Sequence, residues 1–271
     1  MGRGIAEVAA LAGLPVVLCK ATGGDPETGL RAIEQAMERG VRRQKIDAAQ
    51  RDAALARVRC TADLGELGGV GFVVESIVEA VGPKRALYRA LEARLGDGAI
   101  LATNTSSLSL GELAAGLREP ARFVGLHFFS PVPAMKLVEI AAPSTTAAAT
   151  VEAAEAMAAR LGKIAVTTGD TPGFIVNRLL IPMLLDAMRL LEAGVAKAPA
   201  IDAAMKLGCG HPLGPLALAD AIGLDVVLAI AEALQIAPPP VLARLVAAGH
   251  LGKKSGRGIW DYAVDPPGAP S

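Results

Sequence analysis

The chain has 271 residues, enough for one large domain or two of ordinary size. Basic and acidic residues number 27 each, so the charge balance favours neither nucleic acid nor an anionic membrane as a partner. Cys19, Cys60 and Cys209 lack metal-site spacing, which is typical of reduced thiols in a cytoplasmic protein. No signal segment is recognised at the start, and the apolar stretch 174–191 carries Asn, Arg and Asp, which favours a buried helix over a membrane span.

Short apolar strands and amphipathic helices alternate along the first part of the chain. The hydrophobic pattern predicts strands at 15–19, 70–76, 99–104, 122–129, 136–141 and 163–169. It predicts helices at 2–12, 28–58, 84–95, 110–116 and 148–161. Such alternation is typical of an α/β domain with a mainly parallel sheet covered on both faces. Only helical periodicity follows, so we predict an α/β domain over 1–169 and an all-helical domain over 170–271.

The opening stretch MGRGIAEV places Gly2 and Gly4 at the start of the first predicted helix. Glycines there let a dinucleotide pyrophosphate approach the backbone, but Gly-x-Gly alone is weak evidence because glycine is common at helix starts. The strand at 15–19 is followed by Lys20, where an acidic residue would bind the ribose hydroxyls of NAD. A lysine cannot accept those hydrogen bonds, but it could bind the 2′-phosphate of NADP.

Six longer motifs follow in order. They are VVESIVEAVGPKRALYRALEARL, ILATNTSSLSLGEL, RFVGLHFFSPVPAMKLVEI, DTPGFIVNRLLIPMLLDA, AMKLGCGHPLGPLALAD and GKKSGRGIWDY. Together they resemble the L-3-hydroxyacyl-CoA dehydrogenase family, including its 3-hydroxybutyryl-CoA members, from Met1 to Tyr262. The resemblance implies a Rossmann-like NAD-binding domain and a helical domain that forms a homodimer. Because the family's cofactor turn begins with a strand and Gly-x-Gly-x-Met-Gly, we expect this chain to lack the first strand and first two glycines.

The resemblance implies an oxidoreductase that interconverts L-3-hydroxyacyl-CoA and 3-oxoacyl-CoA, with hydride transfer to or from a nicotinamide cofactor. His127 matches the family's base, and imidazole suits that role because its pKa lies near neutral pH. Glu139 matches the carboxylate that orients this ring. The alternatives are a core histidine at a strand end and a strand-edge glutamate facing water.

Two polar residues match family positions around the substrate oxygen and the nicotinamide. Ser106 follows a predicted strand, and Asn177 lies among apolar residues in the first helix of the second domain. The alternative for Ser106 is an N-cap of the next helix, a role that Ser107 could also take. The alternative for Asn177 is a hydrogen bond between helices.

The remaining matches concern the cofactor and CoA. The predicted cofactor site consists of Gly2, Gly4, Lys20, Glu79, Lys84, Asn104, Ser106 and Ser130. Glu79 and Lys84 match positions near the nicotinamide, with a solvated helix start as the alternative. Arg43 and Lys45 belong to a basic cluster that could bind CoA phosphates, although a solvated helix face is the plainer interpretation. No metal site is predicted.

Two further hypotheses follow from the same residues. The missing strand and Lys20 would suit a non-catalytic acyl-CoA-binding protein with impaired dinucleotide binding. Lys20 alone would suit a dehydrogenase that prefers NADP. The second domain also carries many apolar helical residues, among them Leu180, Leu184 and Leu191, which hint at self-association.

Overall fold

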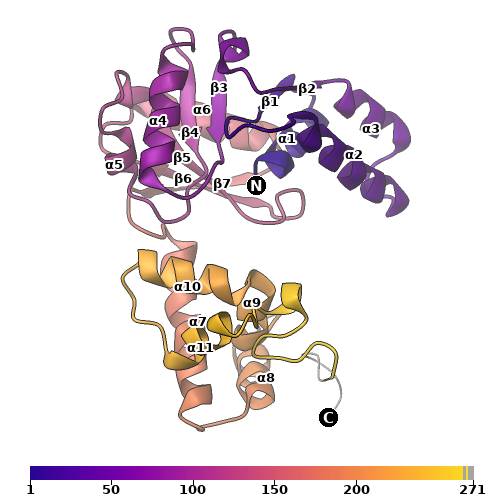
Figure 1. Ribbon diagram of the computed structural model, residues 1–271, viewed down its shortest axis with the longest axis vertical. Coiled ribbons are helices and arrows are strands. Elements are labelled where there is room, and N and C mark those ends of the chain that lie inside the picture. Colours follow the sequence, from indigo (N-terminus) through magenta and orange to yellow (C-terminus); the bar gives the residue numbers. More distant parts are fainter. Residues whose placement is uncertain (265–266, 268–271) are drawn as a thin grey trace. The chain divides into compact units, whose positions relative to one another are not determined.

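The computed structural model describes residues 1–264 and residue 267, and the chain divides into two compact units. The first is Met1–Thr171 and the second is Pro172–Ser271 (Figure 1). All named strands lie in the first unit, whereas the named elements of the second are helical. The structure therefore confirms the predicted fold class, an α/β unit with a mainly parallel sheet followed by a helical unit.

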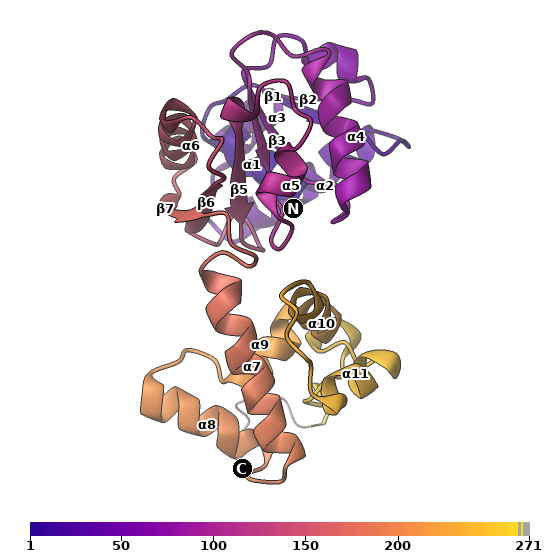
Figure 2. The same ribbon diagram turned by 90° about the vertical axis from the view of Figure 1, so that its left-hand side faces the viewer.

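The first unit contains a five-stranded sheet and a separate two-stranded sheet (Figure 2). Its strands are β1 Val16–Cys19, β2 Val58–Thr61, β3 Phe72–Glu75, β4 Ile100–Thr103, β5 Phe123–Phe128, β6 Leu137–Ala142 and β7 Ile164–Gly169. Its α-helices are α1 Gly2–Leu11, α2 Glu27–Arg42, α3 Ala48–Leu55, α4 Val81–Glu92, α5 Leu110–Ala114 and α6 Ala148–Arg160. The larger sheet has the order β3-β4-β5-β6-β7, and its neighbours are parallel except for the antiparallel pair β5–β6. The strands β1 and β2 pair in parallel.

Helix α1 packs against both sheets. Ala6 and Ala10 belong to the apolar cluster of β1 and β2, whereas Ile5 and Val8 belong to the cluster built on β4, β5 and β6. Gly4 lies at a close approach, because a Cβ atom there would stand only 3.0 Å from the Val132 Cβ atom. At Gly2 the nearest atom would be 3.7 Å away, an ordinary contact. Gly4 therefore has a packing role, in addition to any role at the cofactor turn.

The predicted helix over 28–58 is wrong, because this segment forms two helices and the start of a strand. Helix α2 ends at Arg42, and Gln44 then adopts a left-handed backbone with φ of 55°. Asp47 caps α3, and its side chain accepts a hydrogen bond from the Gln50 backbone in a reciprocal capping box. Strand β2 follows and was missed, because charged Arg59 interrupts its apolar pattern and its pairing with β1 decides its conformation.

The second unit contains α7 Val176–Glu192, α8 Ala198–Cys209, α9 Pro215–Ile222, α10 Leu224–Ala233 and α11 Pro240–Ala247. Its core is formed by the apolar faces of these helices, with Ile181, Leu184, Leu216 and Leu242 fully buried. Two buried aspartates, Asp202 and Asp220, accept hydrogen bonds from the backbone of neighbouring segments. Within the part of the chain that the structure describes, no helix is both long and apolar enough to cross a membrane.

Candidate active site

The central feature of the first unit is a histidine–glutamate pair on adjacent strands. His127 on β5 lies directly opposite Glu139 on β6 in the antiparallel ladder. Cross-strand partners share one face of a sheet, and the His127 Nδ1 atom lies 2.8 Å from the Glu139 Oε2 atom. Glu139 is fully buried, so the alternative of a strand-edge glutamate facing water is wrong. A carboxylate at Nδ1 fixes the ring orientation, stabilises an imidazolium and directs proton exchange to Nε2.

The segment 104–107 follows the carboxyl end of β4, where open α/β sheets bind their ligands. The Asn104 backbone N–H donates to the Glu75 carbonyl at 2.8 Å. The Asn104 Oδ1 atom accepts a hydrogen bond of 2.9 Å from the Phe128 backbone. Asn104 therefore ties this segment to the end of β5, beside His127. Its predicted contact with the cofactor stays a prediction.

Ser106 is held through its backbone. Glu79 Oε1 accepts hydrogen bonds from Ser106 N at 3.0 Å and from Thr105 Oγ1 at 2.5 Å. The N-cap of α5 is Ser109, so the helix-cap alternatives for Ser106 and Ser107 are both wrong. The Ser106 hydroxyl makes no hydrogen bond to the part of the chain that the structure describes. This arrangement fixes the backbone at Ser106 and leaves its hydroxyl for a ligand.

Lys84 occupies a buried position, contrary to the alternative of a solvated helix start. Its side chain is 1% exposed, and its Nζ atom lies 2.8 and 2.9 Å from the two Glu75 carboxylate oxygens. The same Nζ atom is 3.3 Å from Glu79 Oε2, whose side chain is 38% exposed. Lys84 thus contacts both Glu75 and Glu79, and its predicted contact with the cofactor stays a prediction.

Glu75 is the buried partner of Lys84, and the sequence predictions did not include it. It also accepts hydrogen bonds from Tyr88 OH and Thr103 Oγ1, each at 2.7 Å, and from the Ile77 backbone at 2.6 Å. Burial raises the pKa of Glu75, but Lys84 and these donors outweigh burial, so the pKa lies below its ordinary value. A carboxylate at the end of the apolar run GFVVE was the available signal, because a buried carboxylate requires partners.

Lys20 lies immediately after β1, as the sequence indicates. Its Nζ atom is 3.4 Å from both the Asp25 carbonyl and the Thr28 hydroxyl, which makes these hydrogen bonds long and weak. Asp25 pairs instead with Arg31 at 2.5 Å. A loosely held cation therefore stands at the carboxyl end of β1, where the adenosine ribose would be recognised.

The other predicted residues are more dispersed. Arg43 and Lys45 are exposed beyond the end of α2. Ser130 is exposed in the turn after β5, and Asn177 is buried in the first turn of α7 in the second unit. Of the predicted catalytic residues, the first unit thus joins His127 to Glu139 directly and brings the Ser106 segment to the same strand end through Asn104.

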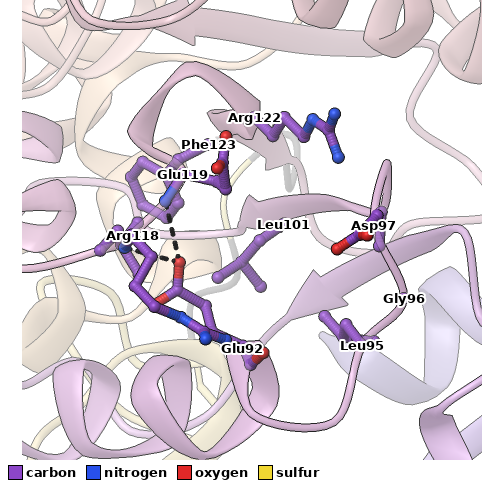
Figure 3. A pocket seen from close by; sticks show the side chains of 11 residues that line it. Glu92, Leu95, Gly96, Asp97, Leu101, Arg118, Glu119, Arg122 and Phe123 are labelled. Carbon is purple, nitrogen blue, oxygen red and sulfur yellow. Dashed lines mark hydrogen bonds between the residues drawn. The ribbon is translucent and has the colours of Figure 1, made fainter.

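A cavity of about 500 Å³ opens at the other end of the sheet (Figure 3). It is lined by Glu92, Leu95, Gly96, Asp97, Ala99, Leu101, Leu117, Arg118, Glu119, Arg122 and Phe123. Glu92 accepts hydrogen bonds from the backbones of Arg118 and Glu119, as the dashed lines show. Phe123 begins β5, whereas His127 lies near the carboxyl end of that strand. The cavity is therefore separate from the His127–Glu139 pair.

The fold and the pair together define an α/β dehydrogenase with an added helical unit. Residues 1–171 match the family described as 3-hydroxyacyl-CoA dehydrogenase, NAD binding domain, and residues 173–262 match its C-terminal domain. The chain therefore belongs to the 3-hydroxyacyl-CoA dehydrogenase family and is an enzyme of that family with an NAD-binding domain.

Several known proteins and solved structures are similar to the chain over nearly its full length. A 3-hydroxybutyryl-CoA dehydrogenase from Bradyrhizobium diazoefficiens is 43% identical over 97% of this chain and 92% of that protein. A probable 3-hydroxybutyryl-CoA dehydrogenase from Bacillus subtilis is 41% identical, covering 97% and 94%. The crystal structure of (S)-3-hydroxybutyryl-CoA dehydrogenase from Ralstonia eutropha superposes with a TM-score of 0.90 at 39% identity, covering 96% and 94%.

Proposed function

We propose that this enzyme interconverts short-chain L-3-hydroxyacyl-CoA, such as 3-hydroxybutyryl-CoA, and the corresponding 3-oxoacyl-CoA in the cytoplasm. The observation that carries the proposal is the buried contact of 2.8 Å between His127 Nδ1 and Glu139 Oε2 near the carboxyl end of β5. The names of the similar proteins support the short-chain substrate.

In the proposed reaction, His127 Nε2 takes the proton of the substrate 3-hydroxyl group while the C3–H bond breaks. Glu139 holds the ring and stabilises the positive charge that this proton brings. The Ser106 hydroxyl donates a hydrogen bond to the substrate oxygen as it becomes a ketone, and Asn177 helps to orient the substrate. In the reverse direction, His127 returns the proton to the oxygen.

The donor set of the first unit fits a nicotinamide dinucleotide, which when bound accepts or supplies the hydride. Gly2 opens α1, whose N-terminal N–H groups suit a pyrophosphate. Glu79, Ser106, Asn104 and Ser130, with Lys84 behind Glu79, would hold the nicotinamide end. Lys20 gives the cofactor proposal a second form, in which NADP binds in preference to NAD, because a weakly held ammonium can pair with a 2′-phosphate.

Further parts of the proposal concern CoA and self-association. Exposed Arg43 and Lys45 would pair with CoA phosphates. A homodimer would form through the second unit, where Leu207 on α8 is 88% exposed and Val195 is 68% exposed. We expect Leu207→Asp to halve the molar mass measured by light scattering, whereas an unchanged mass would place the interface elsewhere.

The direct test is reduction of acetoacetyl-CoA by the purified protein with NADH and with NADPH. Loss of nicotinamide absorbance with either cofactor supports the proposed reaction. If neither cofactor is oxidised, calorimetry with acyl-CoA and with both cofactors distinguishes the alternative. Binding of acyl-CoA without binding of NADH or NADPH would favour a non-catalytic acyl-CoA-binding protein.

A further inference from the structure

Glu75 lies at the centre of a buried polar network outside the residues predicted for catalysis. Its side chain is 0% exposed and receives hydrogen bonds from Lys84, Tyr88, Thr103 and the Ile77 backbone. Both carboxylate oxygens are engaged, Oε1 by Lys84 and Ile77 and Oε2 by Lys84, Tyr88 and Thr103. A carboxylate with so many donors has one orientation, so it provides a fixed anchor inside the unit.

Lys84 connects this anchor to the surface. Its Nζ atom contacts both Glu75 oxygens and also stands 3.3 Å from Glu79 Oε2. Helix α4 carries Lys84 and Tyr88 one turn apart, so both side chains meet Glu75 from the same helix face. The ring of Tyr88 also packs against Phe123, with ring centroids 5.4 Å apart. These contacts hold the ammonium group in place beneath Glu79.

Glu79 in turn holds the segment around Ser106, which is predicted to bind the substrate. While Oε2 faces Lys84, Oε1 accepts from Thr105 Oγ1 at 2.5 Å, from Ser106 N at 3.0 Å and from Ser107 Oγ at 3.4 Å. Thr105 Oγ1 in turn accepts from the Leu108 backbone at 3.1 Å. One partly exposed carboxylate thus fixes a complete turn of backbone around Ser106.

Charge explains why the buried anchor is needed. Two carboxylates share the single ammonium of Lys84, and Glu79 is the more solvated of the two. Without the charge on Glu75, a buried Lys84 would have Glu79 as its remaining anionic partner and would draw it inward. Glu79 would then leave the position from which it binds the Ser106 turn.

We propose that Glu75 is a positioning residue for the dehydrogenase site. It fixes Lys84, Lys84 fixes the direction of Glu79, and Glu79 fixes the backbone of Ser106. Tyr88 and Thr103 orient the Glu75 carboxylate. The inference rests on the proposed function only in that Ser106 contacts the substrate.

The kinetic test is a double-mutant cycle between Glu75→Gln and Glu79→Gln in the full chain. We expect Glu75→Gln to lower kcat about tenfold with a smaller change in KM, because it misplaces Ser106. In the Glu79→Gln background the link is already broken, so Glu75→Gln should cause no further loss. An equal factor in both backgrounds would mean that Glu75 merely stabilises the fold, and would overturn the proposal.

Tyr88→Phe and Glu38→Gln supply the graded and matched controls. Tyr88→Phe removes one donor to Glu75 but keeps the ring and the Lys84 pair, so kcat should fall only about twofold. Glu38 pairs with Arg51 at 2.6 Å in the same unit, away from this network. We expect Glu38→Gln to leave kcat and KM unchanged.

Hydrogen exchange supplies a measurement that does not require turnover. The backbone amides of Ser106 and Leu108 should exchange about tenfold faster in Glu75→Gln, and no faster in Glu38→Gln. If the wild type does not reduce acetoacetyl-CoA, the proposed reaction fails, and the exchange rates alone decide the positioning role. Unchanged exchange of these two amides in Glu75→Gln would overturn that role.

Discussion

Both units bury carboxylates, but the groups that donate hydrogen bonds to these carboxylates differ. In the first unit, Glu139 pairs with the His127 ring, and Glu75 binds Lys84 and Tyr88. Most of these donors are side chains that can gain or lose a proton or change rotamer. A carboxylate with such partners can take part in proton transfer or transmit a displacement.

In the second unit the donors are mainly backbone groups. Asp202 accepts from the Leu216 and Ala217 backbones at the start of α9 and from the Trp260 ring nitrogen. Asp220 accepts hydrogen bonds from the backbone N–H groups of Ile259 and Trp260. It therefore holds the segment 259–260 against α9. Backbone donors move only when the local fold opens. These aspartates therefore stabilise the unit, whereas we propose that the glutamates of the first unit organise a site.

The strongest test of this comparison removes the titratable donor. We expect His127→Asn to lower kcat about 1,000-fold, because its amide nitrogen stands where His127 Nδ1 stood beside Glu139, but the variant has no general base. Its Tm should change little. The measurement is steady-state acetoacetyl-CoA reduction, with His211→Asn in the second unit as the matched control. A loss of less than about tenfold would show that His127 is not the base.

The corresponding change in the second unit should affect stability rather than turnover. In Asp220→Asn, an amide N–H would face the backbone donor of Trp260, so we expect a loss of about 2 kcal/mol of unfolding free energy. The kcat of the folded enzyme should stay within about twofold. Denaturant titration checks the first expectation and kinetics the second. Asp225→Asn is the control, because Asp225 forms an exposed ion pair with Lys254 and should cost less than about 1 kcal/mol.

Acid should act in opposite directions on buried Glu75 of the first unit and on buried Asp202 and Asp220 of the second. The pKa of Glu75 lies below its ordinary value of 4.5, so its contribution to stability is present above that value and is lost as the pH falls through the lowered pKa. Burial raises the pKa of Asp202 and of Asp220 above the ordinary 3.8. As the pH falls, these two carboxylates therefore take up protons in the folded chain before they do so in the unfolded chain. Their contribution therefore becomes more favourable as the pH falls through the raised values towards 3.8.

We therefore predict that acidification opens the first unit before the second, and that Glu75→Gln weakens this dependence. Trp260 is the single tryptophan of the chain, so its fluorescence follows the second unit. Amide exchange in β3 and α4 follows the first. Measurements from neutral pH to about pH 3 should show the difference in Tm between wild type and Glu75→Gln narrowing below the ordinary glutamate pKa of 4.5. Simultaneous unfolding of both units on acidification would contradict this prediction.

The same contrast explains what the sequence could predict. The pairing of His127 with Glu139 could be predicted, because the motifs that contain them resemble those of a known family, and the antiparallel ladder places the two residues opposite each other. The burial of Lys84 was not, because it depends on how α4 packs over β3 and places its ammonium beside Glu75. Sequence spacing within a helix cannot reveal a partner on another element. Strand β2 was missed for a similar reason, since its pairing with β1 fixes its conformation.

The smallest effect is expected from replacing Lys20, whose charged group is not buried in either unit. Lys20 makes two hydrogen bonds of 3.4 Å and no ion pair within the described residues, so replacing it should leave Tm nearly unchanged. We expect Lys20→Asp to raise the ratio of kcat/KM for NADH over NADPH about fivefold, because the carboxylate can accept from the ribose hydroxyls and repels a 2′-phosphate. Arg94→Gln is the control, because exposed Arg94 follows α4 and donates to the Ala90 carbonyl without contacting Lys20 or Asp25. An unchanged ratio in Lys20→Asp would show that the cation after β1 does not contact the adenosine ribose, and that cofactor choice lies elsewhere in the first unit.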